Sequence, residues 1–172
     1  ATIQNLHIMG TITTAGLRPA GITSYVEDES YIRNCWSEVA ITSSYNNDID
    51  AGGFVARVDS GSTLHLDDCV FTGSITYNNE GYEVGGLVGW TQSGGIVVVQ
   101  NCLFAPSSIT TASHINHNDR LLNSMFVSGY QANVTITNSY YNPVAAATDW
   151  TVQGTSTTDE QLADGTTTAA LQ

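Results

Sequence analysis

The sequence repeats itself at intervals of about 33–37 residues, and this repeat limits the possible folds more than any other feature. Cys35, Cys69 and Cys102 lie 34 and 33 residues apart, and Ser139 takes the equivalent position 37 residues after Cys102. An Asn or Asp precedes each of these four positions, and Asn5-Leu6 opens a partial copy at the start of the chain. Self-similarity with this period is typical of solenoids, in which each copy forms one coil and stacks on the next.

Residues 84–106 form the most complete copy, and its side chains alternate with a period of two. The copy contains Gly85-Gly86-Leu87-Val88-Gly89, a turn, and the β-branched run 96–101. This alternation predicts strands, and no helical stripe fits these segments. Each copy is expected to contain three short strands, of which one is the Gly-Gly-Leu-Val-Gly segment. We therefore predict an all-β chain that folds as a right-handed parallel β-helix of about four triangular coils.

Alignment of the copies predicts ladders of side chains that stack from coil to coil. A polar ladder is expected at the bend before the cysteine position, because Asn and Asp tolerate the left-handed backbone that such bends need and their side chains can bond to one another. Its members are Asn5, Asn34, Asp68, Asn101 and Asn138. The inward ladders are expected to be Ile22/Phe54/Leu87/Phe126, Ile32/Leu66/Val99/Ile136, Cys35/Cys69/Cys102/Ser139 and Ile41/Ile75/Ile109.

The repeats define the expected domain organisation. Residues 1–143 form the β-helix region, with a partial coil over 1–19 and coils over about 20–51, 52–84, 85–119 and 120–143. Residues 144–172 form a C-terminal cap, in which Thr158 and the acids after it, with Gly165, indicate the start and end of a short helix. A cap is expected because an exposed row of strand groups at the end of a sheet promotes aggregation.

The composition excludes several classes of partner. The chain has 172 residues, of which 12% are charged, and its formal net charge is −12 with Lys and Arg together numbering four. Nucleic acid and anionic membrane surfaces are poor partners for such a chain, because binding to phosphates needs clustered basic residues. No apolar run approaches the roughly 20 residues of a membrane span. The chain begins within a strand-like segment, so an excised or mature fragment is expected, and the absence of a signal peptide says nothing about secretion.

The three cysteines are expected to be free thiols within the core stack, where they behave as small hydrophobic residues. A disulfide between neighbouring coils is the alternative, since strand spacing of about 4.8 Å falls within the Cα separations that disulfides span. Parallel side-chain directions make this pairing awkward.

Gly85-Gly86-Leu87-Val88-Gly89, followed by Asn101-Cys102 and an aromatic residue, resembles the GLUG motif of bacterial surface proteins, adhesins of gut bacteria and N-terminal regions of IgA-specific metallopeptidases. The end of the chain, from Tyr140-Tyr141 through residues 158–171, resembles the tail that follows such repeats. The resemblance covers roughly residues 20–172. The first copy departs from the motif, and the last lacks both the glycine pair and the cysteine. The resemblance implies a β-helix at a bacterial cell surface and no catalytic residues.

Clusters of titratable residues have simpler interpretations than catalysis or metal binding. His114 and His117 lie in a polar segment with no further His or Cys in phase, whereas zinc needs three or four ligands. The acids of 27–29 and 48–50 lack the glycine-bearing spacing of calcium loops and are expected in solvated turns. Arg33 and Asp67 share an outward phase and are expected to form an ion pair between coils. We therefore expect no metal site, no cofactor and no catalytic residues.

Aromatic residues that the inner ladders do not require are the remaining candidates for a binding surface, because Tyr and Trp among Asn, Ser and Gly give contact area with adaptable hydrogen bonds. They are expected on the outer surface or in loops, although the same mixture also decorates ordinary exposed sheets. These candidates are Tyr31, Tyr45, Tyr77, Tyr82, Trp90 and Tyr130.

The function expected from the sequence is that of a non-enzymatic, adhesin-like module of a bacterial surface or secreted protein. Such a module binds a glycan or a host protein, or serves as a stalk for neighbouring domains of a longer chain. One alternative is a carbohydrate-active β-helix, a polysaccharide lyase or hydrolase, although glycoside cleavage needs a pair of carboxylates and the phase of Asp67 contains one acid. Another is a non-catalytic segment of a larger surface peptidase.

Overall fold

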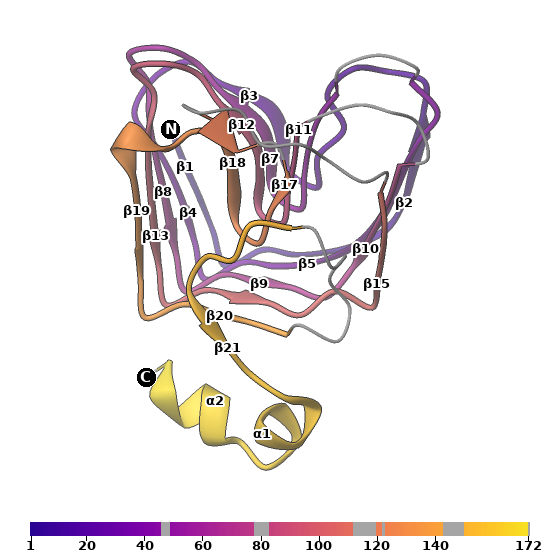
Figure 1. Cartoon of the computed structure of the whole chain (residues 1–172), viewed down its shortest axis with the longest axis vertical. Helices are drawn as coiled ribbons and strands as arrows, with labels where there is room; N and C mark the ends of the chain where they lie inside the picture. Colours follow the sequence, from indigo (N-terminus) through magenta and orange to yellow (C-terminus); the bar gives the residue numbers. More distant parts are fainter. Residues whose placement is uncertain (46–48, 78–82, 112–119, 122, 143–149, 172) are drawn as a thin grey trace.

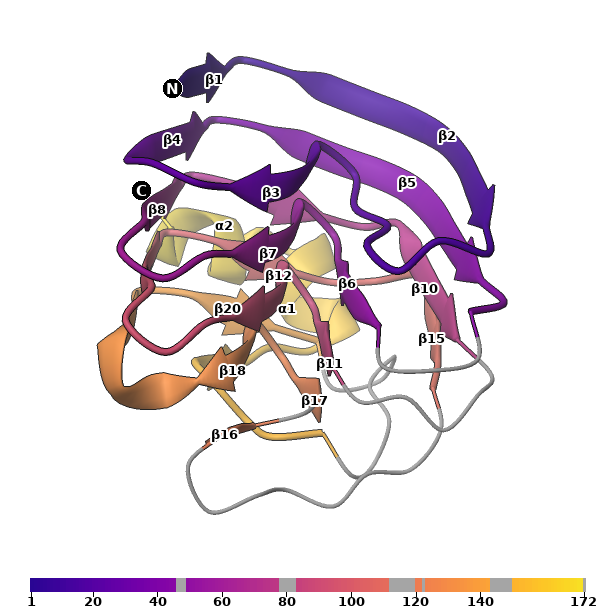
Figure 2. The same cartoon turned by 90° about the horizontal axis from the view of Figure 1, so that it is seen from above.

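The chain folds as a parallel β-solenoid of about four turns with a short helical C-terminal end, as the sequence predicts (Figure 1, Figure 2). The computed structural model describes residues 1–45, 49–77, 83–111, 120–121, 123–142 and 150–171. Strands of successive coils pair in parallel, and among the described strands only β16 and β18 pair antiparallel.

Two sheets form the outer walls of the solenoid (Figure 1). Sheet A contains five strands, one from each coil in order: β1 (Thr2–Gln4), β4 (Ser30–Arg33), β8 (Thr63–Asp67), β13 (Ile96–Gln100) and β19 (Val134–Thr137). Sheet B contains β2 (His7–Thr14), β5 (Trp36–Ser43), β9 (Val70–Phe71), β10 (Ser74–Tyr77), β14 (Leu103–Phe104), β15 (Ser108–Thr110), β20 (Tyr140–Tyr141) and β21 (Thr155–Ser156).

Two further sheets lie between these walls, so the predicted triangular coil with three strands is wrong. Sheet C contains β6 (Asp50–Gly52), β11 (Glu83–Gly85) and β17 (Asn123–Ser124). Sheet D contains β3 (Thr23–Val26), β7 (Val55–Val58), β12 (Val88–Thr91), β18 (Val127–Tyr130) and β16 (Arg120–Leu121).

The glycine pair explains how sheets C and D fit inside the coil. Gly85 ends β11, and Gly86 and Leu87 form a bend before β12 begins at Val88. A Cβ atom on Gly86 would overlap the Met125 carbonyl oxygen and the ring of Phe104. The pair therefore forms a tightly packed corner rather than the start of a strand, since only a residue without a side chain permits such close approach.

The four predicted inward ladders are confirmed. Leu66 pairs with Ile32 and Val99, which in turn pairs with Ile136. Ile75 likewise pairs with Ile41 and Ile109. Most of the ladder residues are fully buried and belong to one continuous core, against which the terminal members Ile22, Ile109 and Ile136 pack with partial exposure. Stacking equivalent residues therefore forms the core along the whole solenoid.

The cysteine ladder consists of free, buried thiols, so the disulfide alternative is wrong. Each thiol donates to the carbonyl two residues before it, at 3.2 Å for Cys35, Cys69 and Cys102. Ser139 makes the same bond to Thr137 O at 2.8 Å. The hydroxyl reproduces the thiol's hydrogen bond, which explains why serine occupies this position in the last coil.

The C-terminal segment contains two helices instead of the predicted one, and they lie beside sheet B rather than over the open end of the last coil (Figure 1, Figure 2). Helix α1 (Asp159–Ala163) starts with a capping box between Thr158 and Gln161, and α2 (Thr166–Ala170) follows it. The Gln153 side chain accepts bonds from the N–H groups of Phe126 and Val127 at 3.0 and 2.8 Å and donates to the Val127 carbonyl at 2.9 Å. The Gln153 amide thus takes the place of a further strand beside Phe126 and Val127, while β16 pairs with Gly129 and Tyr130 further along β18.

The buried thiols should be almost unreactive in the folded protein. Burial raises the pKa of Cys35, and contact with the Cys102 thiol together with burial raises the pKa of Cys69. The thiolate is the nucleophile, so iodoacetamide at pH 8 should label the native chain far more slowly than the unfolded chain, whose thiol pKa is roughly 8.5.

Because these pKa values are raised on folding, the thiols stabilise the fold below the ordinary thiol pKa, and this contribution is lost as the pH rises beyond it. The free energy of unfolding should therefore fall above roughly pH 8.5, and Cys69→Ser should reduce the slope. Rapid labelling of the native chain, or stability independent of pH in this window, contradicts the buried ladder.

Candidate functional site

The predicted aromatic candidates do not gather into one site. Tyr77 and Trp90 are buried, so the expectation that they lie on the surface is wrong. Tyr77 follows Ile75 by two residues on β10 and therefore points inward with it. Trp90 lies on β12, whose four residues are all buried, and Arg57 of the paired strand β7 and the ring of Tyr130 lie beside it.

The other four candidates are scattered. Tyr130 is partly exposed and packs edge-to-face against Trp90, with ring centroids 5.8 Å apart. Tyr45 is also partly exposed, and Tyr82 lies outside the described residues. Tyr31 is the candidate with the most polar surroundings, on the outer face of sheet A.

The polar ladder forms the corner where each coil passes from sheet A to sheet B, as predicted. Its members Asn5, Asn34, Asp68, Asn101 and Asn138 have φ between 42° and 56° and are the non-glycine residues with positive φ in the described chain. We call this set the corner ladder. Asn34 Nδ2 donates to Asn5 Oδ1 at 2.7 Å, and Asn138 Nδ2 donates to Asn101 Oδ1 at 2.8 Å. Asn138 Nδ2 also donates to the Ala170 carbonyl of α2 at 3.1 Å, so the ladder ends on the cap.

An outer stripe of largely apolar residues runs beside the corner ladder, one residue beyond the cysteine position. Register places its members side by side on consecutive strands of sheet B: His7, Trp36, Val70, Leu103 and Tyr140. The rings of His7 and Trp36 stack with centroids 4.2 Å apart, and Trp36 Nε1 donates to Thr72 Oγ1 at 2.7 Å. Trp36 is 42% exposed although it is the largest residue of the stripe.

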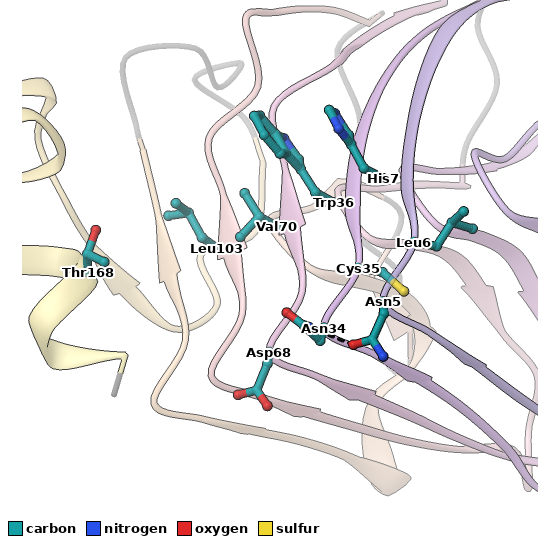
Figure 3. A pocket seen from close by; sticks show the side chains of 10 residues that line it. All are labelled: Asn5, Leu6, His7, Asn34, Cys35, Trp36, Asp68, Val70, Leu103 and Thr168. Atoms are coloured by element: carbon teal, nitrogen blue, oxygen red, sulfur yellow. Dashed lines mark hydrogen bonds between the residues drawn. The ribbon is translucent and has the colours of Figure 1, made fainter.

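A lateral hollow of about 530 Å³ lies between the outer stripe and the corner ladder (Figure 3). Figure 3 shows Trp36, Val70 and Leu103 on successive strands, Asn5 and Asn34 on the other side, and Thr168 on α2. The hollow spans the coils from the first to the fourth and reaches the cap. Its volume lies within the roughly 300–1,000 Å³ that is usual for ligand sites.

A second exposed cluster lies on sheet A and contains Glu29, Tyr31, Arg33, His65 and Asp67. The predicted ion pair is present, with Arg33 Nε 3.1 Å from Asp67 Oδ2. The Tyr31 ring stacks on His65 at 4.6 Å, and its hydroxyl donates to Glu29 Oε1 at 2.6 Å. That hydrogen bond is the main cause that raises the pKa of Tyr31. Arg33 therefore balances one of the two carboxylates of the sheet A cluster, and Tyr31 is a weaker acid than a free phenol, so it stays protonated near neutral pH.

The acid Asp50 is buried in an ion-pair network, which corrects its expected place in a solvated turn. Asp50 Oδ2 lies 2.7 Å from Arg18 Nε and 3.2 Å from an Nη atom of Arg57, while Arg57 Nε lies 2.8 Å from Asp59 Oδ1. Sequence analysis missed this network because its members come from three unrelated phases of the repeat. The acids Glu27, Asp28 and Glu29 are exposed, as expected.

Among the described residues, no group of three or more His, Cys, Asp or Glu side chains could hold a metal ion. His114, His117 and Asp48 lie outside the described residues. No helix within the described ranges is both long and apolar enough to cross a membrane.

Comparisons with family models, curated proteins and solved structures found no match for this chain.

The corner ladder predicts one stabilising substitution. Asp68 accepts from Asn101 Nδ2 at 3.0 Å, but its carboxylate cannot donate to Asn34 as the other members do to their neighbours. Asp68→Asn adds that donor and removes one negative charge, so the free energy of unfolding should rise by up to about 1 kcal/mol.

Urea unfolding measures this change. Asp67→Asn is the matched control, since it removes the partner of Arg33 without adding a ladder bond and should not stabilise. Equal effects of the two substitutions, or a loss of stability with Asp68→Asn, contradict the assignment of the ladder bonds.

Proposed function

We propose that this chain is a non-enzymatic, adhesin-like binding module of a bacterial cell-surface or secreted protein. The observation that carries the proposal is the outer stripe, in which Trp36 is exposed and Val70 and Leu103 are partly exposed along a hollow that crosses several coils. Apolar and aromatic side chains on the outside of a sheet are costly to leave in water unless they contact a ligand or partner. The resemblance to GLUG-motif proteins supports a location at the cell surface.

The polar groups of the corner ladder and of the sheet A cluster support a role without catalysis. The corner ladder uses its amides to bind neighbouring coils, and Arg33 and Asp67 are paired with each other. A general acid or base needs a proton-transfer group free to reach a substrate. On sheet A the carboxylate of Glu29 is engaged by the Tyr31 hydroxyl.

A carbohydrate-active enzyme is the second candidate, because the structure places Glu29 in the same cluster as Asp67. Glu29, Tyr31, Arg33, His65 and Asp67 together offer two carboxylates, two potential bases and a cation on one exposed face. Glu29 thus supplies a second acid, which the repeat position of Asp67 does not contain. The pairing of these groups with one another makes this function the weaker of the two.

One set of assays separates the two functions. The purified chain is incubated with neutral and acidic polysaccharides, and new reducing ends and unsaturated sugar products are measured. In parallel, its binding to a glycan array and to immobilised extracellular-matrix proteins is measured. The proposal predicts binding in the second assay and no product in the first.

Asp67→Ala provides the control. Product release that disappears in folded Asp67→Ala would establish the enzyme and refute the proposal. Folded protein that neither binds nor cleaves leaves the stalk role in place of the adhesin-like one.

A further inference from the structure

Building on the proposed binding function, we propose that the lateral hollow binds a neutral oligosaccharide that lies along the solenoid axis. A sugar ring has an apolar face of C–H groups and a rim of hydroxyls. The hollow offers a matching pair of walls, one apolar and one lined with amides (Figure 3).

The apolar wall is the outer stripe. Strands lie about 4.8 Å apart, so the three steps from His7 to Leu103 extend for roughly 14 Å. The Trp36 indole is held by its stack on His7 and by its bond to Thr72, so little side-chain entropy remains to be lost on binding. His7 covers one face of this indole and Thr72 accepts its N–H, and Trp36 still remains 42% exposed, which leaves apolar ring surface for the C–H groups of a ligand.

The polar wall is the corner ladder. A side-chain amide has two N–H donors and an oxygen with two acceptor sites. The bond from Asn34 to Asn5 uses one donor of Asn34 and one acceptor site of Asn5. Each exposed amide thus keeps bonding capacity for a ligand hydroxyl. The left-handed backbone and the contact between coils fix its position before any ligand arrives.

Charge favours a neutral ligand. The described residues that line the hollow include Asp68 but no Lys or Arg, and the whole chain carries −12. His7 Nε2 lies 2.6 Å from Glu38 Oε1, so this imidazole already has an anionic partner. A phosphate, sulfate or uronate would meet repulsion in the hollow without a compensating cation.

An extended peptide fits the hollow less well than a sugar. β5, β9 and β14 carry Trp36, Val70 and Leu103, and each of these strands is paired on both sides, so among the described strands a sheet edge borders the hollow only at β2, which carries His7. Strand addition needs unpaired backbone groups at a sheet edge. The hollow offers side-chain amides and an apolar wall, which match hydroxyls and C–H groups.

The test uses an array of neutral and anionic oligosaccharides, and the best neutral binder is then titrated by calorimetry. Trp36→Ala should weaken its affinity about tenfold or more, and Trp36→Phe should retain part of it. Met9→Ala is the matched control, because Met9 is 68% exposed on the same sheet without lining the hollow, and it should bind like wild type.

Two-dimensional NMR of the wild-type chain locates the sugar without any substitution. Binding should shift the indole N–H signal of Trp36 and the side-chain amide signals of Asn5 and Asn34. Shifts confined to the sheet A cluster overturn this proposal and leave the binding function intact. Binding of a host protein without binding of any sugar has the same two consequences. Binding of anionic sugars alone overturns the charge argument and with it the proposal. No ligand at all overturns both the hollow and the adhesin-like function.

Discussion

The left-handed corner between sheets A and B is the constraint on which the rest of the structure depends. Five residues adopt positive φ there, and all are Asn or Asp, the side chains that tolerate this conformation best. The bend turns the next residue inward, where Cys35, Cys69, Cys102 and Ser139 stack. It also turns the residue after that outward, which creates the outer stripe. A shift by one residue would exchange these two sets, so the corner fixes the inside and the outside of each coil.

The first and the last coils of the solenoid differ in what covers them. At the C-terminal end, Asn138 bonds to α2, while the Gln153 amide and strand β21 take the place of a further coil beside β18 and β20. Trp150 adds a flat ring over Phe104, with centroids 6.2 Å apart. At the other end, β1 and β2 form the edges of their sheets within the described chain, and Leu6 is 36% exposed at the cysteine position. The corner ladder connects these ends and forms one side of the hollow.

The sequence predicted those features that repeat. The inward ladders, the Asn corners, the Arg33–Asp67 pair and the helix at Thr158 all follow from phase or from a local capping signal, and the structure confirms them. Sheets C and D were not resolved as separate sheets, because a glycine pair in an apolar run fits a strand as well as a bend. The sequence does not show the burial of Trp90 either, because Arg57 and Tyr130 lie beside it only in the folded chain.

The lateral hollow could be predicted only in part. The sequence shows the aromatic residue Trp36 after Asn34-Cys35. Its alignment with His7, Val70 and Leu103 into one outer stripe depends on the pairing of strands that lie far apart in the chain. The Asp50 network shows the same limit, because Arg18 and Arg57 reach one buried carboxylate from two different segments. The relation of the chain to GLUG-motif proteins stays a prediction.

Nuclear Overhauser contacts between backbone protons of stacked strands test the in-register stacking most directly. The account predicts contacts that connect Leu66 to Val99 and Val99 to Ile136, residues 33 and 37 positions apart, together with contacts between the side-chain amides of Asn101 and Asn138. Contacts displaced by one or more residues, or contacts confined to neighbours in sequence, would show that equivalent positions do not stack and would contradict the account.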